Sequence, residues 1–192
     1  MIKAEDIKKL REETQAPVME CKKALEEASG DFEKAKKILE KAGKARAEKK
    51  EQNVTKTGII EAYVHSNKKV GVLLELRCET DFVAKNQEFQ NLAHDLCMHI
   101  AAMNPLYVSL SKIPEAVINE KKEEYKKEVT GKPPEIVEKI VMGKLEKELQ
   151  EICLEKQPFV KDDTKIVGDL LQEATAKFGE KIEVERFVRF SL

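Results

Sequence analysis

The residues best placed to act on another molecule lie in one short stretch, residues 75–85, which reads ELRCETDFVAK. Thr80 and Asp81 are suited to begin a helix, because their short side chains can accept hydrogen bonds from free backbone N–H groups. Phe82 and Val83 follow at once, so two apolar side chains lie where the chain changes direction. They could form an exposed tip, or they could be a hydrophobic plug beneath the turn, as apolar residues beside helix caps often are. The residue types leave both possibilities open.

The other polar residues offer little for covalent chemistry. His94 and His99 are five residues apart in a predicted helix, so they do not share a face, whereas Asp95 and His99 are four apart and could pair. His65 is expected to be exposed near a turn. The sequence contains no phosphate-binding glycine loop, dinucleotide-binding glycine pattern or nucleophile elbow. We therefore expect no enzyme activity, no nucleotide site of the chain's own, no metal site and no cofactor.

The charge balance argues against a nucleic-acid-binding protein. The 35 Lys and Arg residues nearly equal the 36 Asp and Glu residues, which leaves a net charge of −1 and no basic field for phosphates. No apolar run approaches the ~20 residues of a membrane span. The first residues, MIKAEDIKKL, lack the apolar core of an export signal. We therefore expect a cytoplasmic protein without direct nucleic acid or membrane contact.

The four cysteines show no metal-binding or redox spacing. None belongs to a CxxC pair, and all are far apart: Cys21, Cys78, Cys97 and Cys153. We expect them to be small buried thiols in a reducing compartment.

The N-terminal part predicts a helical module over residues 1–43. Apolar residues at helical spacing indicate three short helices, the second opened by Pro17 and the third capped by Asp31 and stopped at Gly43. Three such helices resemble a ubiquitin-associated module, a type that binds other proteins. Residues 44–56 are highly charged and lack an apolar face, so we predict a polar linker there.

Residues 57–192 predict an α+β core domain, in which a small antiparallel sheet packs with helices and a helical hairpin. Alternating apolar residues over 58–65 and 70–78 predict a β-hairpin, which a closing strand over 182–190 is expected to join. Apolar residues at helical spacing predict four helices, over residues 86–103, 114–129, 135–156 and 166–178. The second and third are expected to form the helical hairpin, with a break at residues 131–134. Gly179 is expected to end the last helix.

Three stretches together resemble the bacterial elongation factor Ts family. TDFVAK at residues 80–85 is similar to that family's signature, and LREETQAPVMECKKALEEASGDFEKA at residues 10–35 resembles its N-terminal module. AKFGEKIEVERF at residues 176–187 resembles its glycine turn and closing strand. The resemblance covers nearly the whole chain in the family's order, in a short form with a single core. Pro17 and Arg77 depart from the pattern, which usually has a small residue and Asn or Val at these positions.

The resemblance implies a function and a set of site residues. It implies a guanine nucleotide exchange factor that promotes GDP release from elongation factor Tu, in translation elongation, by disturbing the Mg²⁺ and phosphate site. It implies that Mg²⁺ is dislodged from the partner by four residues, Thr80, Asp81, Phe82 and Val83, with Phe82 as the wedge. Partner binding is implied at Met19, Lys22 and Gly179. Longer members of the family resemble a duplicated core, so a single copy predicts a homodimer.

Two of these positions, and the function as a whole, have plain alternatives. Met19 could be a core residue, and Lys22 could be a solvated charge. The whole chain could be a non-catalytic adaptor that binds proteins through a ubiquitin-associated-like module without changing nucleotide affinity. A hydrolase using Glu75, Asp81 or His65 has little support.

Overall fold

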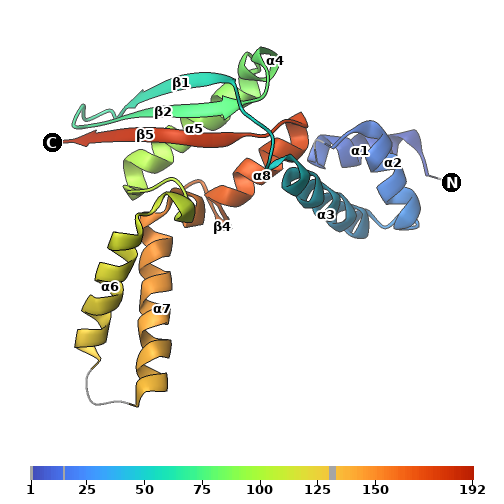
Figure 1. Ribbon diagram of the computed structural model, residues 1–192. Coiled ribbons are helices and arrows are strands. Elements are labelled where there is room, and N and C mark those ends of the chain that lie inside the picture. The colour runs from blue at the N-terminus through green and yellow to red at the C-terminus, as the bar shows by residue number, and fades with distance from the viewer. Residues whose placement is uncertain (1, 15, 130–132) are drawn as a thin grey trace. The chain divides into compact units, whose positions relative to one another are not determined.

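The computed structural model describes residues 2–14, 16–129 and 133–192, and it confirms the predicted α+β class (Figure 1). The predicted break at residues 131–132 lies outside the described residues. The chain divides into two compact units. The first unit contains the chain up to residue 59 together with residues 77–89 and 170–183, and the second contains residues 60–76, 90–169 and 184–192.

The first unit begins with three helices, as predicted. They are α1 (Ala4–Thr14), α2 (Val18–Glu27) and α3 (Phe32–Lys50). Their shared core is small and apolar, and its fully buried members are Leu10, Cys21, Leu25 and Ala35. Asp31 caps α3, because its carboxylate accepts a hydrogen bond from the Lys34 N–H at 3.0 Å.

The predicted end of the third helix at Gly43 is wrong, because α3 continues to Lys50 through part of the predicted linker. The reason is that Gly43 and Ala47 serve close packing rather than termination: Ala47 is buried, and a Cβ at Gly43 would lie 3.2 Å from the Cβ of Ala176 in α8 (Val167–Phe178). Arg46 donates a hydrogen bond to the Ala176 carbonyl at 3.1 Å and pairs with Glu20. Small residues thus supply the buried face that a search for large apolar residues misses. The division of the chain into domains 1–43, 44–56 and 57–192 stays a prediction.

The second unit contains most of a three-stranded antiparallel sheet, whose strands are β1 (Thr57–Val64), β2 (Val70–Cys78) and β5 (Glu183–Ser191). The strand order is β1-β2-β5, which confirms the predicted hairpin and its pairing with the closing strand. One face of β2 is buried through Val72, Leu74 and Leu76. Helix α5 (Gln87–Met103) is tied to β5 by Arg189, which donates to the Ala101 carbonyl at 3.2 and 3.1 Å.

The second unit also contains the predicted helical hairpin, formed by α6 (Glu115–Glu128) and α7 (Pro134–Ile152), which lie side by side in Figure 1. Tyr125 of α6 donates a hydrogen bond to Glu148 of α7, so the pair is joined by polar as well as apolar contacts. Helix α7 ends four residues earlier than predicted, because Cys153 forms a β-bridge with Tyr107.

Short connecting elements complete the unit, and sequence patterns did not predict them. The 3₁₀ turns are η1 (Leu110–Lys112) and η2 (Leu154–Lys156). A two-stranded ribbon of β3 (Pro158–Phe159) and β4 (Asp162–Ile166) follows. The sequence of β4, DDTKI, lacks the apolar alternation that identifies a strand.

The predicted pairing of Asp95 with His99 is also wrong. Asp95 binds Lys161 at 2.7 Å, whereas His99 is fully buried. The Val160 N–H donates to Nδ1 of His99 at 3.2 Å, so the ring proton lies on Nε2, which donates to the Gln157 side-chain oxygen at 2.9 Å. Burial lowers the pKa of His99, and the imidazole is therefore a neutral, hydrogen-bonded core residue.

The backbone at Gly168 leaves no room for a side chain. A Cβ at this position would lie 2.9 Å from the Glu155 carbonyl oxygen, which belongs to the backbone and cannot turn aside. We predict that Gly168→Ala lowers the free energy of unfolding by about 1–3 kcal/mol, the usual range for overpacking. Urea denaturation measures this change.

The matched control is Gly143→Ala in α7, where a Cβ meets nothing within 4 Å. Alanine at an exposed helical position should raise stability by about 0.5–1 kcal/mol. Equal effects of the two substitutions would contradict the close packing at Gly168.

Candidate functional site

The predicted tip is a single helical turn, α4 (Asp81–Ala84), which follows β2 directly along the chain. The Phe82 side chain is 85% exposed, whereas Val83 is only 5% exposed. The two alternatives that the sequence left open therefore apply to different residues: Val83 is the plug beneath the turn, and Phe82 is the exposed tip. Ala84 is also buried, so the turn rests on two small apolar side chains while the ring projects.

Thr80 lies at the predicted N-cap position of α4, but its side chain does not cap the helix. Its hydroxyl donates to Oε1 of Glu180 at 2.6 Å, and its backbone N–H donates to Oε2 of the same carboxylate at 3.0 Å. The expected capping bond is absent, and the hydroxyl is directed at the carboxylate of Glu180 instead. Hydrogen bonds to a carboxylate are stronger than those between neutral groups. One carboxylate thus holds two donors of one residue.

A second carboxylate, that of Glu79, binds groups around the residue before the tip. Oε1 of Glu79 accepts hydrogen bonds from the Lys181 backbone N–H at 2.7 Å and from the Asn53 side chain at 2.9 Å. The Lys50 ammonium lies 3.6 Å from the same oxygen. Partial burial opposes ionisation of Glu79, but these donors outweigh it and lower the pKa of the carboxyl. The end of α3, the tip and the turn after α8 therefore meet at one ionised group.

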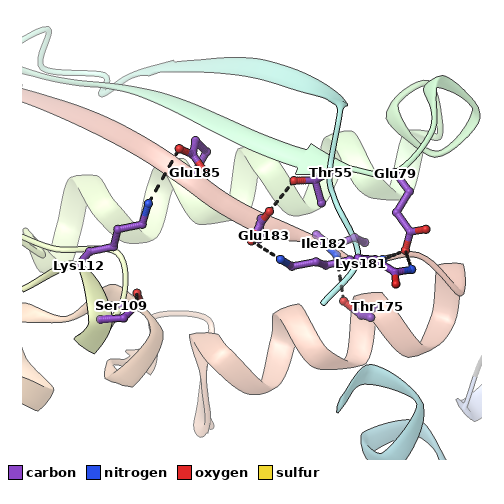
Figure 2. A network of polar contacts seen from close by, with 11 residues as sticks. Thr55, Glu79, Ser109, Lys112, Thr175, Lys181, Ile182, Glu183 and Glu185 are labelled. Atoms are coloured by element: carbon purple, nitrogen blue, oxygen red, sulfur yellow. Dashed lines mark hydrogen bonds and ion pairs between the residues drawn. The ribbon is translucent and has the colours of Figure 1, made fainter. Parts of the chain in front are cut away.

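The turn after α8 is itself rigidly held. Gly179 ends the helix at φ +70°, a conformation that other residues rarely adopt. The buried Thr175 hydroxyl accepts a hydrogen bond from the Ile182 N–H at 3.1 Å. Figure 2 shows the Glu183 carboxylate between Lys181 and Thr55, both of which bind it. The turn is thus fixed on both sides of Glu180.

Sequence reasoning missed Glu79 and Glu180, the two side chains that hold the tip. They are about one hundred residues apart from their partners, and acidic residues at turns are usually solvated. The one available signal was their placement, because Glu79 comes directly before the cap and Glu180 directly after the glycine turn. An acidic side chain directly beside one predicted turn is therefore a candidate for binding a backbone N–H group of another turn.

The other predicted site residues lie at two places. Gly179 is beside the tip, because its neighbour Glu180 binds Thr80. Met19 and Lys22 lie on α2, where Met19 is 62% exposed, so the alternative of a core methionine is wrong. Lys22 is half exposed, and its ammonium lies 3.9 Å from Glu26.

The described part of the chain shows no metal centre. Within residues 2–14, 16–129 and 133–192, no three His, Cys, Asp or Glu side chains are placed to hold a metal ion. The four cysteines are free and buried, as predicted. Burial, with a smaller contribution from Glu61, raises the pKa of Cys97 to about 12, so this thiol is not a reactive thiolate. None of the helices in the same residues combines the length and the apolar character needed to cross a bilayer.

These features define an α+β protein that presents a fixed, exposed aromatic tip. A family model described as Elongation factor TS matches residues 2–192. A protein named Elongation factor Ts from Thermodesulfovibrio yellowstonii is 54% identical over 192 residues, which is 100% of this chain and 96% of that protein. The protein of that name from Thermotoga petrophila is 55% identical over 186 residues, 97% of this chain and 94% of its own length.

A third relative extends the match to a further organism. Elongation factor Ts from Thermosipho melanesiensis is 52% identical over 194 residues, covering 100% of this chain and 99% of its own. The chain therefore belongs to the elongation factor Ts family, a family of translation elongation factors. The predicted membership in this family is confirmed over the full length of the chain.

The exposure of Phe82 makes a direct forecast for stability. Phe82→Ala removes a ring that is already in water, so the free energy of unfolding should change by no more than about 0.5 kcal/mol. Phe89→Ala is the matched control, because Phe89 is fully buried and its ring centroid lies 6.3 Å from that of Phe178. It should lower stability by about 3–5 kcal/mol. Thermal unfolding of both variants checks this, and a comparable loss for Phe82→Ala would show that its ring is packed in solution.

Proposed function

We propose that this chain is a guanine nucleotide exchange factor for elongation factor Tu, that it acts in the cytoplasm during translation elongation, and that it is not an enzyme. The observation that carries the proposal is the tip: an aromatic ring 85% exposed on a turn whose other apolar residues are buried. Exposed aromatic residues on a fixed backbone are typical anchors of protein interfaces. The membership of the chain in the elongation factor Ts family points to the partner.

Exchange needs binding energy and no covalent step. A factor that binds the nucleotide-free GTPase more tightly than the GDP-bound form weakens GDP binding by the same factor, because the two equilibria are linked. GDP is held by backbone N–H groups, a lysine and Mg²⁺, so the metal and the phosphate loop are the points where a small displacement has the largest effect. The chain itself holds no nucleotide in this mechanism.

The residues of the tip have different roles in promoting GDP release. Phe82 is the wedge that displaces the elements framing the metal, and Asp81, exposed beside it, assists in dislodging Mg²⁺. Thr80 and Val83 shape the tip, the first through its bonds to Glu180 and the second through burial. Because Glu180 holds Thr80 and Val83 is buried, distortion falls on the partner rather than on the tip.

A second contact adds affinity. We infer that Met19 and Lys22 on α2 dock on the partner, and that the turn at Gly179 lies near it. In this proposal the helical module 1–43 supplies docking and the core 57–192 supplies exchange, with residues 44–56 between them. A second contact within one chain benefits from a high effective concentration.

The adaptor alternative makes a different forecast for the same complex. An adaptor would use the exposed Met19 and Phe82 as anchors but would bind the GDP-bound and nucleotide-free partner alike. It would leave the rate of GDP release unchanged. The fixed tip is compatible with both functions, whereas the membership in the elongation factor Ts family favours exchange.

Loss of the ring should remove most exchange activity. Release of fluorescent GDP from elongation factor Tu measures it, and we expect Phe82→Ala to lower exchange efficiency by roughly 30- to 1,000-fold, the effect of losing a hot spot of ~2–4 kcal/mol. Asp81→Ala should lower it less, excess Mg²⁺ should oppose the wild-type chain, and Met19→Ala should mainly raise the half-saturating concentration. Val54→Ala is the control, because Val54 is 71% exposed in the same unit but outside the tip. Wild-type release rates with Phe82→Ala would remove the ring from the mechanism.

We also propose that the chain forms a homodimer and binds neither nucleic acid nor membrane. The face of the sheet opposite the buried side chains of β2 carries exposed apolar residues from all three strands: Ile60, Val64, Leu73, Val188 and Phe190. Apolar side chains gathered on one sheet face are typical of an interface. A second copy would cover this face through a two-fold contact.

The mass in solution tests the dimer. Light scattering at micromolar concentration should give twice the 21.9 kDa of one chain. Val188→Glu should shift the mass to that of a monomer, because it buries an unpaired charge in the interface. Val160→Glu, at a 47% exposed position outside this face, should leave the dimer intact. A monomeric wild-type chain would contradict the proposal.

A further inference from the structure

We propose that Glu180 is a positioning residue for nucleotide exchange: it touches neither nucleotide nor Mg²⁺, and it acts by fixing Thr80 and, through Thr80, the Phe82 tip. The inference rests on the proposed exchange function and adds to it a residue outside the tip sequence. In this proposal the turn after α8 contributes to exchange by keeping the tip in position.

The geometry at Thr80 is what makes Glu180 more than a surface acid. The two carboxylate oxygens of Glu180 accept hydrogen bonds from the backbone N–H of Thr80 at 3.0 Å and from its hydroxyl at 2.6 Å. Together these bonds fix both the backbone and the χ1 rotamer of Thr80, which has an extended backbone at φ −131° and ψ 154°. Bidentate, charge-assisted bonds of this kind restrict direction as well as distance.

The tip needs this external support. Helix α4 has only four residues, and a single helical turn is not stable by itself, because nucleation fixes several dihedral angles for one hydrogen bond. The Ala84 N–H binds the Thr80 carbonyl at 3.3 Å, so the turn that carries Phe82 begins at the residue that Glu180 holds. A shift of Thr80 would therefore also displace the ring of Phe82, which is only two residues further along the chain.

The two carboxylates form a reciprocal arrangement. Glu180 binds the N–H of Thr80, and Glu79 binds the N–H of Lys181, so each turn supplies an acceptor to the backbone of the other. Gly179 explains how Glu180 reaches its place: a Cβ there would meet nothing within 4 Å, so glycine serves the positive φ rather than a close contact. The sequence Gly179-Glu180-Lys181 thus supports the tip from within the chain, because it binds residues 79 and 80 directly.

The experiment uses the full chain with Glu180→Ala and Glu180→Gln, and with Glu88→Ala as the matched control. Glu88 forms an exposed ion pair with Lys177 at 2.8 Å in the same unit, without a bond to the tip. Three quantities are measured for each variant: hydrogen exchange of the Thr80 amide by NMR, and the maximal rate and the half-saturating concentration of GDP release from elongation factor Tu.

We expect Glu180→Ala to speed hydrogen exchange at Thr80 and to lower the maximal release rate by roughly ten- to hundredfold, the effect of misplacing an acting group by about 1 Å. The half-saturating concentration should change by less than about threefold, because docking through α2 is unaltered. Glu180→Gln keeps one acceptor oxygen, so its maximal release rate should fall between those of the wild-type chain and of Glu180→Ala. Glu88→Ala should behave as wild type, because Glu88 binds Lys177 and not Thr80.

Two results would overturn the proposal while leaving the exchange function intact. One is a wild-type maximal rate with Glu180→Ala, and the other is an equal loss with Glu88→Ala, which would indicate a general effect of removing an acid from this unit. Failure of the wild-type chain to accelerate GDP release would instead overturn the proposed function and this role with it. The hydrogen exchange at Thr80 separates the cases, because it reports on the tip without the partner.

Discussion

Two carboxylates that bind backbone N–H groups are the interaction on which the tip depends. Glu79 and Glu180 join turns that are about one hundred residues apart, and each satisfies a donor that the other turn leaves free. Backbone donors near helix ends need such partners, and a carboxylate is the strongest acceptor a side chain offers. These bonds and the burial of Val83 and Ala84 together give the exposed ring of Phe82 a defined direction, since one turn of helix cannot supply it.

The carboxylate of Glu79 also links the tip to the N-terminal helices. Glu79 also binds Asn53, which follows α3, and α3 packs on α8 where Gly43 meets Ala176. Small residues let the two helices approach closely, and Arg46 closes the contact on the Ala176 carbonyl. The extension of α3 beyond Gly43 therefore also serves the tip, because it brings the end of the helix to the carboxylate of Glu79.

Much of this structure could be predicted from local patterns, and the rest could not, for physical reasons. The hairpin, the closing strand and α5 follow from apolar periodicity, which directly reflects a buried face. The end of α3, the ribbon of β3 and β4 and the burial of His99 depend on partners distant in sequence, which periodicity does not record. At the site, the signature identified Thr80 to Val83, but only the structure shows which of the two apolar side chains is exposed. The roles of Glu79 and Glu180 were hidden for the same reason, because each depends on the other turn.

Exchange requires that the chain bind the nucleotide-free form of its partner more tightly than the GDP-bound form. Isothermal titration calorimetry of the chain with elongation factor Tu, once without nucleotide and once saturated with GDP and Mg²⁺, measures this difference directly. The account predicts that the nucleotide-free partner is bound at least about 100-fold more tightly, a coupling free energy of ~3 kcal/mol, and that the chain weakens GDP binding by the same factor. Equal affinity for the two forms would contradict exchange by this chain and would leave it a protein-binding adaptor.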